Sequence, residues 1–220
     1  MITDKVLGQG QTPTYVFTPT YIEEGQLIQQ PAYSKEPMAQ RNEEAIKLLE
    51  EAGYSKANPL KFSILYNTNE NHKKVAIAAA SMWKANTKGL IDVKLENQEW
   101  KTYIDSRRAG RYDAARAGWN ADYNQATTFG NYFLSNSSNN TAKYANPEYD
   151  KAIAESYVAT DAEGRAKAYA KAEEILAKDF GIVPIFNYVN PRLVKPYVKG
   201  YSGKDPQDHI YLRNLYIIKH

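Results

Sequence analysis

The stretch LKFSILYN, residues 60–67, decides the fold class of this 220-residue chain. Phe62, Ile64 and Tyr66 alternate against Lys61 and Ser63, which is the two-residue period of a strand. The stretch that follows, residues 71–86, is rich in alanine and contains methionine and tryptophan, which predicts a helix. A strand that leads directly into a helix begins a unit with parallel strands, so we expect an α/β sheet.

The same order of elements continues on both sides of that unit. Residues 90–97 predict a second strand, residues 98–110 a helix stopped by a glycine, and residues 111–118 a third strand. Residues 41–52 predict an amphipathic helix before the first strand. In α/β sheets ligands bind beyond the carboxyl ends of the strands, so a site is expected just after the third strand.

The ends of the chain are less regular. The first forty residues contain four prolines and predict an extended segment that wraps over a surface. Prolines and glycines also punctuate residues 190–208, which predict a linker. The other predicted elements are helices over residues 146–160 and 161–179, a buried strand over 180–189 and a terminal strand over 209–220.

Composition places the chain among globular proteins and argues against several partners. Lys and Arg number 28 against 25 Asp and Glu, and no basic block is present, so we expect no nucleic-acid partner. The chain has no cysteine, which excludes disulfides and thiolate metal sites. It has no apolar stretch near the ~18 residues needed to cross a bilayer, and no export signal at its start.

Catalytic and metal-binding motifs are missing from the sequence. The three histidines, His72, His209 and His220, form no Ser–His–Asp signature and no pair at helical spacing. There is no HExxH motif, no calcium loop and no glycine-rich phosphate loop. We therefore expect a binding protein without metal or cofactor rather than an enzyme.

The stretch ARAGWNADYNQATTF, residues 115–129, carries a cation, a large ring and an anion within seven positions. Small residues around Gly118 leave the backbone open, so an extended ligand could pair with it as an added strand. Arg116 would take a carboxylate, Asp122 an ammonium group, and Trp119 would flank side chains, which together fit a short zwitterionic peptide. The alternative is a structural ion pair between Arg116 and Asp122, with Trp119 in the core.

Several longer stretches carry a resemblance to a known family. They are NEEAIKLLEEAG (42–53), LENQEWKT (95–102), ARAGWNADYN (115–124), LSNSSNNTA (134–142), RLVKPYVKGYSGKDP (192–206) and NLYIIKH (214–220). These resemble the solute-binding proteins, family 5, of bacterial ABC importers, above all the periplasmic oligopeptide binders, beside binders of dipeptides, murein peptides, glutathione and nickel. The resemblance runs over the whole chain and implies the type II periplasmic-binding-protein fold, an α/β architecture.

The resemblance also implies a division of the chain and a place in the cell. Residues 1–188 correspond to the second, C-terminal large lobe without its start, and residues 189–220 to the hinge crossover and a terminal segment of the first lobe. Such proteins are periplasmic, so an export signal is expected on an N-terminal part that this chain lacks. The implied partners are short peptides and the permease of an ABC importer in the inner membrane.

The resemblance assigns roles residue by residue. Asp122 corresponds to the residue that binds the peptide amine, and Arg116 and His72 to partners of the terminal carboxylate in peptides of different lengths. Arg107 corresponds to a nearby cation that lines the pocket. The segment that pairs with the peptide backbone consists of Ala117, Gly118, Trp119 and Asn120.

Two details bear on the ligand. His72 falls in the first turn of the predicted helix over 71–86, where the helix dipole attracts anions. A lysine with which family members hold longer peptides would fall at Leu7 or Gly8, so selection for the longest peptides is not implied. The leading hypothesis is a short-peptide binder with little side-chain selectivity. The others are a binder of a murein tripeptide, dipeptide, glutathione or metal chelate, and an enzyme or structural partner module.

Overall fold

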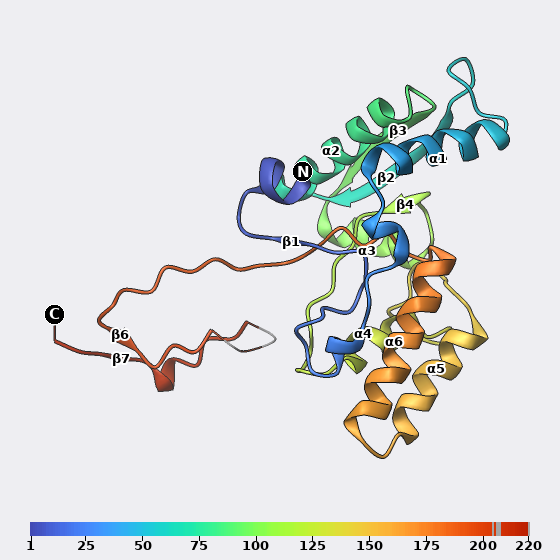
Figure 1. The fold of residues 1–220 in the computed structure, drawn as a ribbon. Coiled ribbons are helices and arrows are strands. Elements are labelled where there is room, and N and C mark those ends of the chain that lie inside the picture. Colours follow the sequence, from blue (N-terminus) through green and yellow to red (C-terminus); the bar gives the residue numbers. More distant parts are fainter. Residues whose placement is uncertain (204, 206–207, 220) are drawn as a thin grey trace.

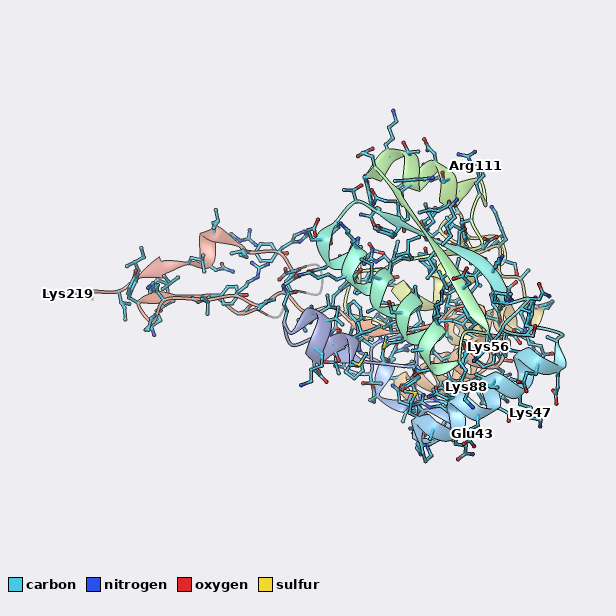
Figure 2. The ribbon with its side chains drawn as sticks, turned by 90° about the horizontal axis from the view of Figure 1, so that it is seen from above. Glu43, Lys47, Lys56, Lys88, Arg111 and Lys219 are labelled. Atoms are coloured by element: carbon cyan, nitrogen blue, oxygen red, sulfur yellow. The ribbon has the colours of Figure 1, made fainter. Side chains whose placement is uncertain are left out.

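The chain folds into a sheet region and a helical unit, with a tail that extends away from both (Figure 1). The computed structural model describes residues 1–203, 205 and 208–219. Residues 204, 206, 207 and 220 belong to the predicted linker and terminal strand and lie outside the described residues. Figure 2 shows the tail from above, with Lys219 at its far end.

The sheet region confirms the predicted α/β order. Its parallel strands lie in the order β3-β2-β4, and α2 and α3 make the two crossover connections. The bounds are β2 (Leu60–Asn67), α2 (Glu70–Asn86), β3 (Ile91–Gln98), α3 (Trp100–Arg108) and β4 (Ala114–Ala115). Ile64, Leu65 and Tyr66 are consecutive and buried, so the central strand is covered on both faces near its carboxyl end.

The helical unit packs its helices around an aromatic core. The elements are α4 (Thr127–Gly130), the 3-10 turn η4 (Asn131–Phe133), α5 (Pro147–Val158) and α6 (Ala162–Asp179). Asn146 and Asp161 start α5 and α6, because each side chain accepts a hydrogen bond from the backbone of the first turn. The buried core consists of Val16, Ile28, Ala126, Tyr132, Phe133, Tyr149, Ala152, Ile153, Tyr169, Ala172 and Leu176.

The first forty residues follow a largely extended path, as predicted, but they also contain short helical turns. These are the π-helical turn η1 (Ile2–Leu7) and the 3-10 turns η2 (Gly25–Leu27) and η3 (Ala32–Lys35). The buried carboxylate of Glu173 holds the segment by accepting hydrogen bonds from the backbone of Phe17 (3.0 Å) and Thr18 (2.6 Å). This carboxylate links the N-terminal segment to α6.

The helix predicted over 41–52 is present as α1 (Met38–Glu51), but its apolar face is only partly covered. No residue of α1 is buried, and Leu48 is 55% exposed. The other predicted helices and the first two strands lie within two residues of their expected bounds.

The strand predicted over residues 111–118 is wrong in extent, since only β4 forms. The carboxylate of Asp113 accepts a hydrogen bond from the backbone of Ser63 at 2.7 Å. That side chain takes the place of a backbone acceptor, so the ladder with β2 starts one residue later.

The buried strand predicted over 180–189 is also wrong. Only β5 (Phe186–Asn187) forms, and it pairs antiparallel with β1 (Thr12–Pro13) rather than with the main sheet. The C=O of Ile185 still accepts from the N–H of Thr14 at 3.2 Å, but Pro184 has no N–H to donate and Phe180 has a left-handed backbone at φ 51°, so the pairing does not extend further back.

The terminal strand predicted over 209–220 is reduced to β7 (Tyr216–Ile217), which follows the 3-10 turn η5 (Leu212–Asn214). Its partner is β6 (Val198–Lys199), inside the segment predicted as a linker. Gly200 permits this pairing, because a Cβ at that position would lie 1.8 Å from the backbone oxygen of Asn214.

Candidate ligand-binding site

The backbone that follows β4 is open along one edge of the sheet. β4 pairs with β2 on one side only, and the last bond of this ladder runs from the N–H of Arg116 to the C=O of Leu65 at 2.8 Å. Among the described residues, no hydrogen bond uses the backbone N–H or C=O groups of residues 117–121. Such a row of unpaired groups is a template for an added strand.

Arg116 lies at the start of this open segment as a half-buried cation. Its guanidinium lies over the ring of Tyr188, 5.6 Å from the centroid. Burial, and then the neighbouring charge of Arg107, lower the pKa of Arg116 to about 10, although Tyr103 opposes the shift. None of the ion pairs between described residues includes Arg116, so a ligand anion would supply the missing counter-charge.

His72 belongs to the same electrostatic neighbourhood. It lies in the first turn of α2, where the Asn69 side chain caps the helix by accepting from the backbone of His72 at 3.1 Å. Its ring Nδ1 lies 2.9 Å from Oδ1 of Asn67. Burial and the charge of Arg116 lower the pKa of His72 to about 4, against the opposing hydrogen bond with Asn67. The imidazole is therefore neutral at neutral pH.

Arg107 is engaged within the protein rather than free for a ligand. Its guanidinium donates to the hydroxyls of Tyr132 (3.0 Å) and Thr141 (2.8 Å) and lies 5.5 Å from the ring centroid of Tyr103. These bonds join α3 to the helical unit. Its charge still contributes to the positive potential at Arg116.

Asp122 and Trp119 lie at the other end of the open segment. The Asp122 residue is exposed, and its Oδ2 accepts a hydrogen bond from the hydroxyl of Thr128 at 3.0 Å. The indole N–H of Trp119 donates to the same hydroxyl at 3.3 Å. The Trp119 ring packs edge-on against Tyr132, with centroids 5.0 Å apart, so one side of the ring belongs to the core.

The structure separates the predicted residues into a cationic group and an anionic group. Arg116 and Asp122 do not form one of the described ion pairs, which removes the alternative of a structural pair between them. The described residues hold no cluster of three or more His, Asp or Glu side chains suited to a metal ion. In the same part of the chain, none of the helices is long and apolar enough to span a membrane.

Comparison with known families shows the family to which the chain belongs. The family described as "Bacterial extracellular solute-binding proteins, family 5 Middle" matches residues 1–141. The chain belongs to this family. The predicted resemblance is therefore confirmed, and so is its α/β fold class, because solved members superpose on nearly the whole chain.

Family 5 relatives cover the chain from end to end. The chain is 97% identical to the periplasmic oligopeptide-binding protein OppA of Haemophilus influenzae and 54% identical to that of Salmonella typhimurium, over all 220 residues in both cases. It spans only 41% and 40% of the lengths of these two relatives. The crystal structure of the Haemophilus influenzae OppA complex with RPPGFSPFR matches 99% of the chain and 42% of that protein, with a TM-score of 0.92.

Sequence reasoning missed several residues that support this family 5 site. Tyr188 lies under Arg116 and also touches Gly118, where an added Cβ would meet the Tyr188 hydroxyl at 2.4 Å. Tyr103 donates its hydroxyl to the backbone oxygen of Arg116. Thr128 lies close in sequence to Asp122, but only the structure reveals their bonds. The one sequence signal for the two tyrosines was the abundance of tyrosine, 18 in the chain.

Proposed function

We propose that this chain forms the peptide-contacting lobe of a periplasmic oligopeptide-binding protein that serves an ABC importer. One observation carries the proposal: an open backbone segment lies between a carboxylate and a group of cations without acidic partners, in a chain 97% identical to such a protein. A peptide has the complementary order of charges, with an ammonium group at one end and a carboxylate at the other.

Each part of the site has a chemical role. Asp122 binds the α-ammonium group, and residues 117–120 pair with the peptide backbone as an added strand. Arg116 or His72 receives the terminal carboxylate, depending on peptide length, and Arg107 strengthens the positive potential there. None of these contacts involves a ligand side chain, so selectivity is low. The protein holds the peptide without breaking a bond, so the function is binding rather than catalysis.

The division of the chain follows from the same proposal. Residues 1–188 form one lobe, and residues 189–220 cross a hinge to the other lobe of the longer protein. The exposure of apolar side chains in the tail supports this division: Leu193, Leu212 and Ile217 are 104%, 76% and 69% exposed. Their natural partner would be the lobe that the chain does not include, in a protein exported to the periplasm.

The test uses the chain alone and within a two-lobe protein, made by exchanging these 220 residues into the Haemophilus influenzae relative. We expect mass spectrometry to find mixed peptides of two to five residues copurifying with the two-lobe protein, and calorimetry to measure their binding. The chain alone should bind too weakly for calorimetry at micromolar concentration, because ion pairs left in water are worth only ~0–1 kcal/mol. The proposal would be contradicted if no peptide copurifies with the two-lobe protein, or if the protein turns over an added peptide.

A second candidate ligand is a murein peptide. The chain is 44% identical over all 220 residues to the periplasmic murein peptide-binding protein MppA of Escherichia coli. A murein tripeptide carries the same terminal charges, so the site residues do not distinguish it from other peptides. A competition experiment between trialanine and the murein tripeptide distinguishes the two candidates. Strong preference for the murein tripeptide would favour the murein-peptide binder.

A further inference from the structure

We infer that Thr128 is the positioning residue of the amine-binding end, orienting the carboxylate of Asp122 and the ring of Trp119 through a single hydroxyl group. The inference rests on the proposed function, since it concerns how Asp122 meets a ligand ammonium group. It adds a residue from the helical unit to a site otherwise built from the end of the sheet.

The hydroxyl of Thr128 makes three hydrogen bonds at the same time. It accepts from the backbone N–H of Asp122 at 3.0 Å and from the indole N–H of Trp119 at 3.3 Å. It also lies 3.0 Å from Oδ2 of Asp122. A threonine hydroxyl has one donor and two acceptor positions, so all of its capacity is used.

The direction of the hydroxyl proton follows from its partners. The backbone N–H of Asp122 and the indole N–H of Trp119 can only donate. The hydroxyl must therefore donate its own proton to Oδ2 of Asp122. The other carboxylate oxygen, Oδ1, has no hydrogen bond to a described residue and remains available to a ligand.

Thr128 itself is held by the core. It is 5% exposed and lies in α4 directly before two anchored residues, Phe129 and Gly130. The ring of Phe129 packs edge-on against Phe17, with centroids 5.4 Å apart. The C=O of Gly130 accepts a hydrogen bond from the buried hydroxyl of Tyr149 at 2.7 Å. The hydroxyl of Thr128 is thus a fixed point to which the exposed carboxylate is attached.

Such attachment has a consequence for affinity. An exposed aspartate normally loses rotamer freedom when it binds a cation, and this loss weakens binding. The bond from Thr128 restrains the Asp122 carboxylate before the ligand arrives, and the same hydroxyl keeps the Trp119 ring beside it. Recognition of the free amine should therefore depend on a residue that does not touch the peptide.

The chain offers a matched control next to Thr128. Thr127 is 7% exposed in the same helix turn, but its hydroxyl donates to Gln125 and makes no described bond to Asp122. In the two-lobe protein, Thr128→Val removes the hydroxyl with little change in shape, Thr128→Ser keeps it, and Thr127→Val removes the neighbouring one. The probes are RPPGFSPFR and its N-acetylated form, titrated by calorimetry, with thermal unfolding recorded for each variant.

We expect Thr128→Val to weaken binding of the free-amine peptide by about tenfold, the loss typical of a hydrogen bond to a charged group. Binding of the acetylated peptide should change little, so the preference for the free amine falls by the same factor. Thr128→Ser should restore most of the preference, and Thr127→Val should leave it at the parental value.

Two results would overturn the inference. A Thr128→Val protein that unfolds at the parental temperature and keeps the full preference would show that Thr128 only supports the fold. Loss of the preference for the free amine in Thr128→Ser would show that packing rather than the hydroxyl matters. If Thr128→Val does not fold, Thr128→Ser alone distinguishes these two roles. A parent protein without any preference for the free amine would instead contradict the role of Asp122 in the proposed function.

Discussion

The sheet region and the helical unit meet at residues 116–122, and they prepare the two ends of this segment differently. At the sheet end, Arg116 is a half-buried cation over a tyrosine ring and has no partner among the described carboxylates. At the helical end, Asp122 is exposed but already bonded through its backbone N–H and its Oδ2 to a buried hydroxyl. One end lacks a counter-charge, and the other is oriented in advance.

This difference indicates where a variable ligand can be accommodated. The oriented carboxylate of Asp122 fixes the position of one charged group. The positive potential at the other end comes from Arg116 and Arg107, and His72 lies close enough that the charge of Arg116 lowers its pKa. Under the proposed function, ligands of different length would share the fixed end and differ in whether they reach the Arg116 cation or the neutral imidazole of His72.

The largest effect is expected at the oriented end. Asp122→Asn in the two-lobe protein should weaken peptide binding by about 2–5 kcal/mol, because it leaves an enclosed ammonium group without its counter-charge. N-acetylated peptides should bind the parent protein poorly for the same reason. Calorimetry that finds equal affinity for free and acetylated peptides would show that Asp122 does not bind the ammonium group.

The next largest effect is expected at the cationic end. Arg116→Ala should weaken binding of shorter peptides by about 1.5–3 kcal/mol, the value of a hydrogen bond to a charged group, and affect longer peptides less. His72→Ala should show the opposite dependence on length. Titration of alanine peptides of two to five residues measures both series. Losses that are uniform across lengths would mean that the two side chains act through the structure of the lobe.

A smaller effect tests the packing beneath Arg116. Gly118→Ala places a Cβ 2.4 Å from the hydroxyl of Tyr188, so the ring must move and Arg116 loses its support. Overpacking of this kind costs about 1 kcal/mol or more, measured as a lower free energy of unfolding in urea. The double variant Gly118→Ala with Tyr188→Ala should recover most of the loss caused by the clash. No recovery would show that the strain lies in the backbone.

Local patterns in the sequence were sufficient for the centre of the fold. The alternation in residues 60–67 and the helix that follows depend on neighbouring residues, and both elements form where they were predicted. The strand over 180–189 failed because its partner, β1, lies near the other end of the chain. Its apolar composition predicted a buried strand, but none of these residues is buried, and composition does not specify which backbone supplies the hydrogen bonds.

For the candidate site, the sequence brings together only residues that are neighbours along the chain. Arg116, Trp119 and Asp122 stand together in the sequence because the segment between β4 and α4 carries them in one stretch. Tyr188 reaches Arg116 from a distant segment, so no local pattern could identify it. The role of Thr128 depends on hydrogen-bond directions, which residue spacing does not specify.

The smallest effect is on stability and belongs to the cationic end. Burial and the charge of Arg116 lower the pKa of His72 from 6.5 to about 4 in the folded chain. Between these values the unfolded chain binds more protons, so the stabilisation is complete above pH 6.5 and is lost as the pH falls towards 4. Because His72 is only half-buried, solvent screening reduces the effect to about 1 kcal/mol.

Urea unfolding of the 220-residue chain between pH 7 and pH 4 measures this difference. His72→Gln removes the titrating group, so its free energy of unfolding should fall by about 1 kcal/mol less than that of the parent over this range. Lys73→Gln is the matched control, since it removes an exposed positive charge from the next residue of α2 and should leave the parental slope. If the free energy of unfolding of His72→Gln falls as much as that of the parent between pH 7 and pH 4, the pKa of His72 is not lowered by the fold, and Arg116 does not influence it.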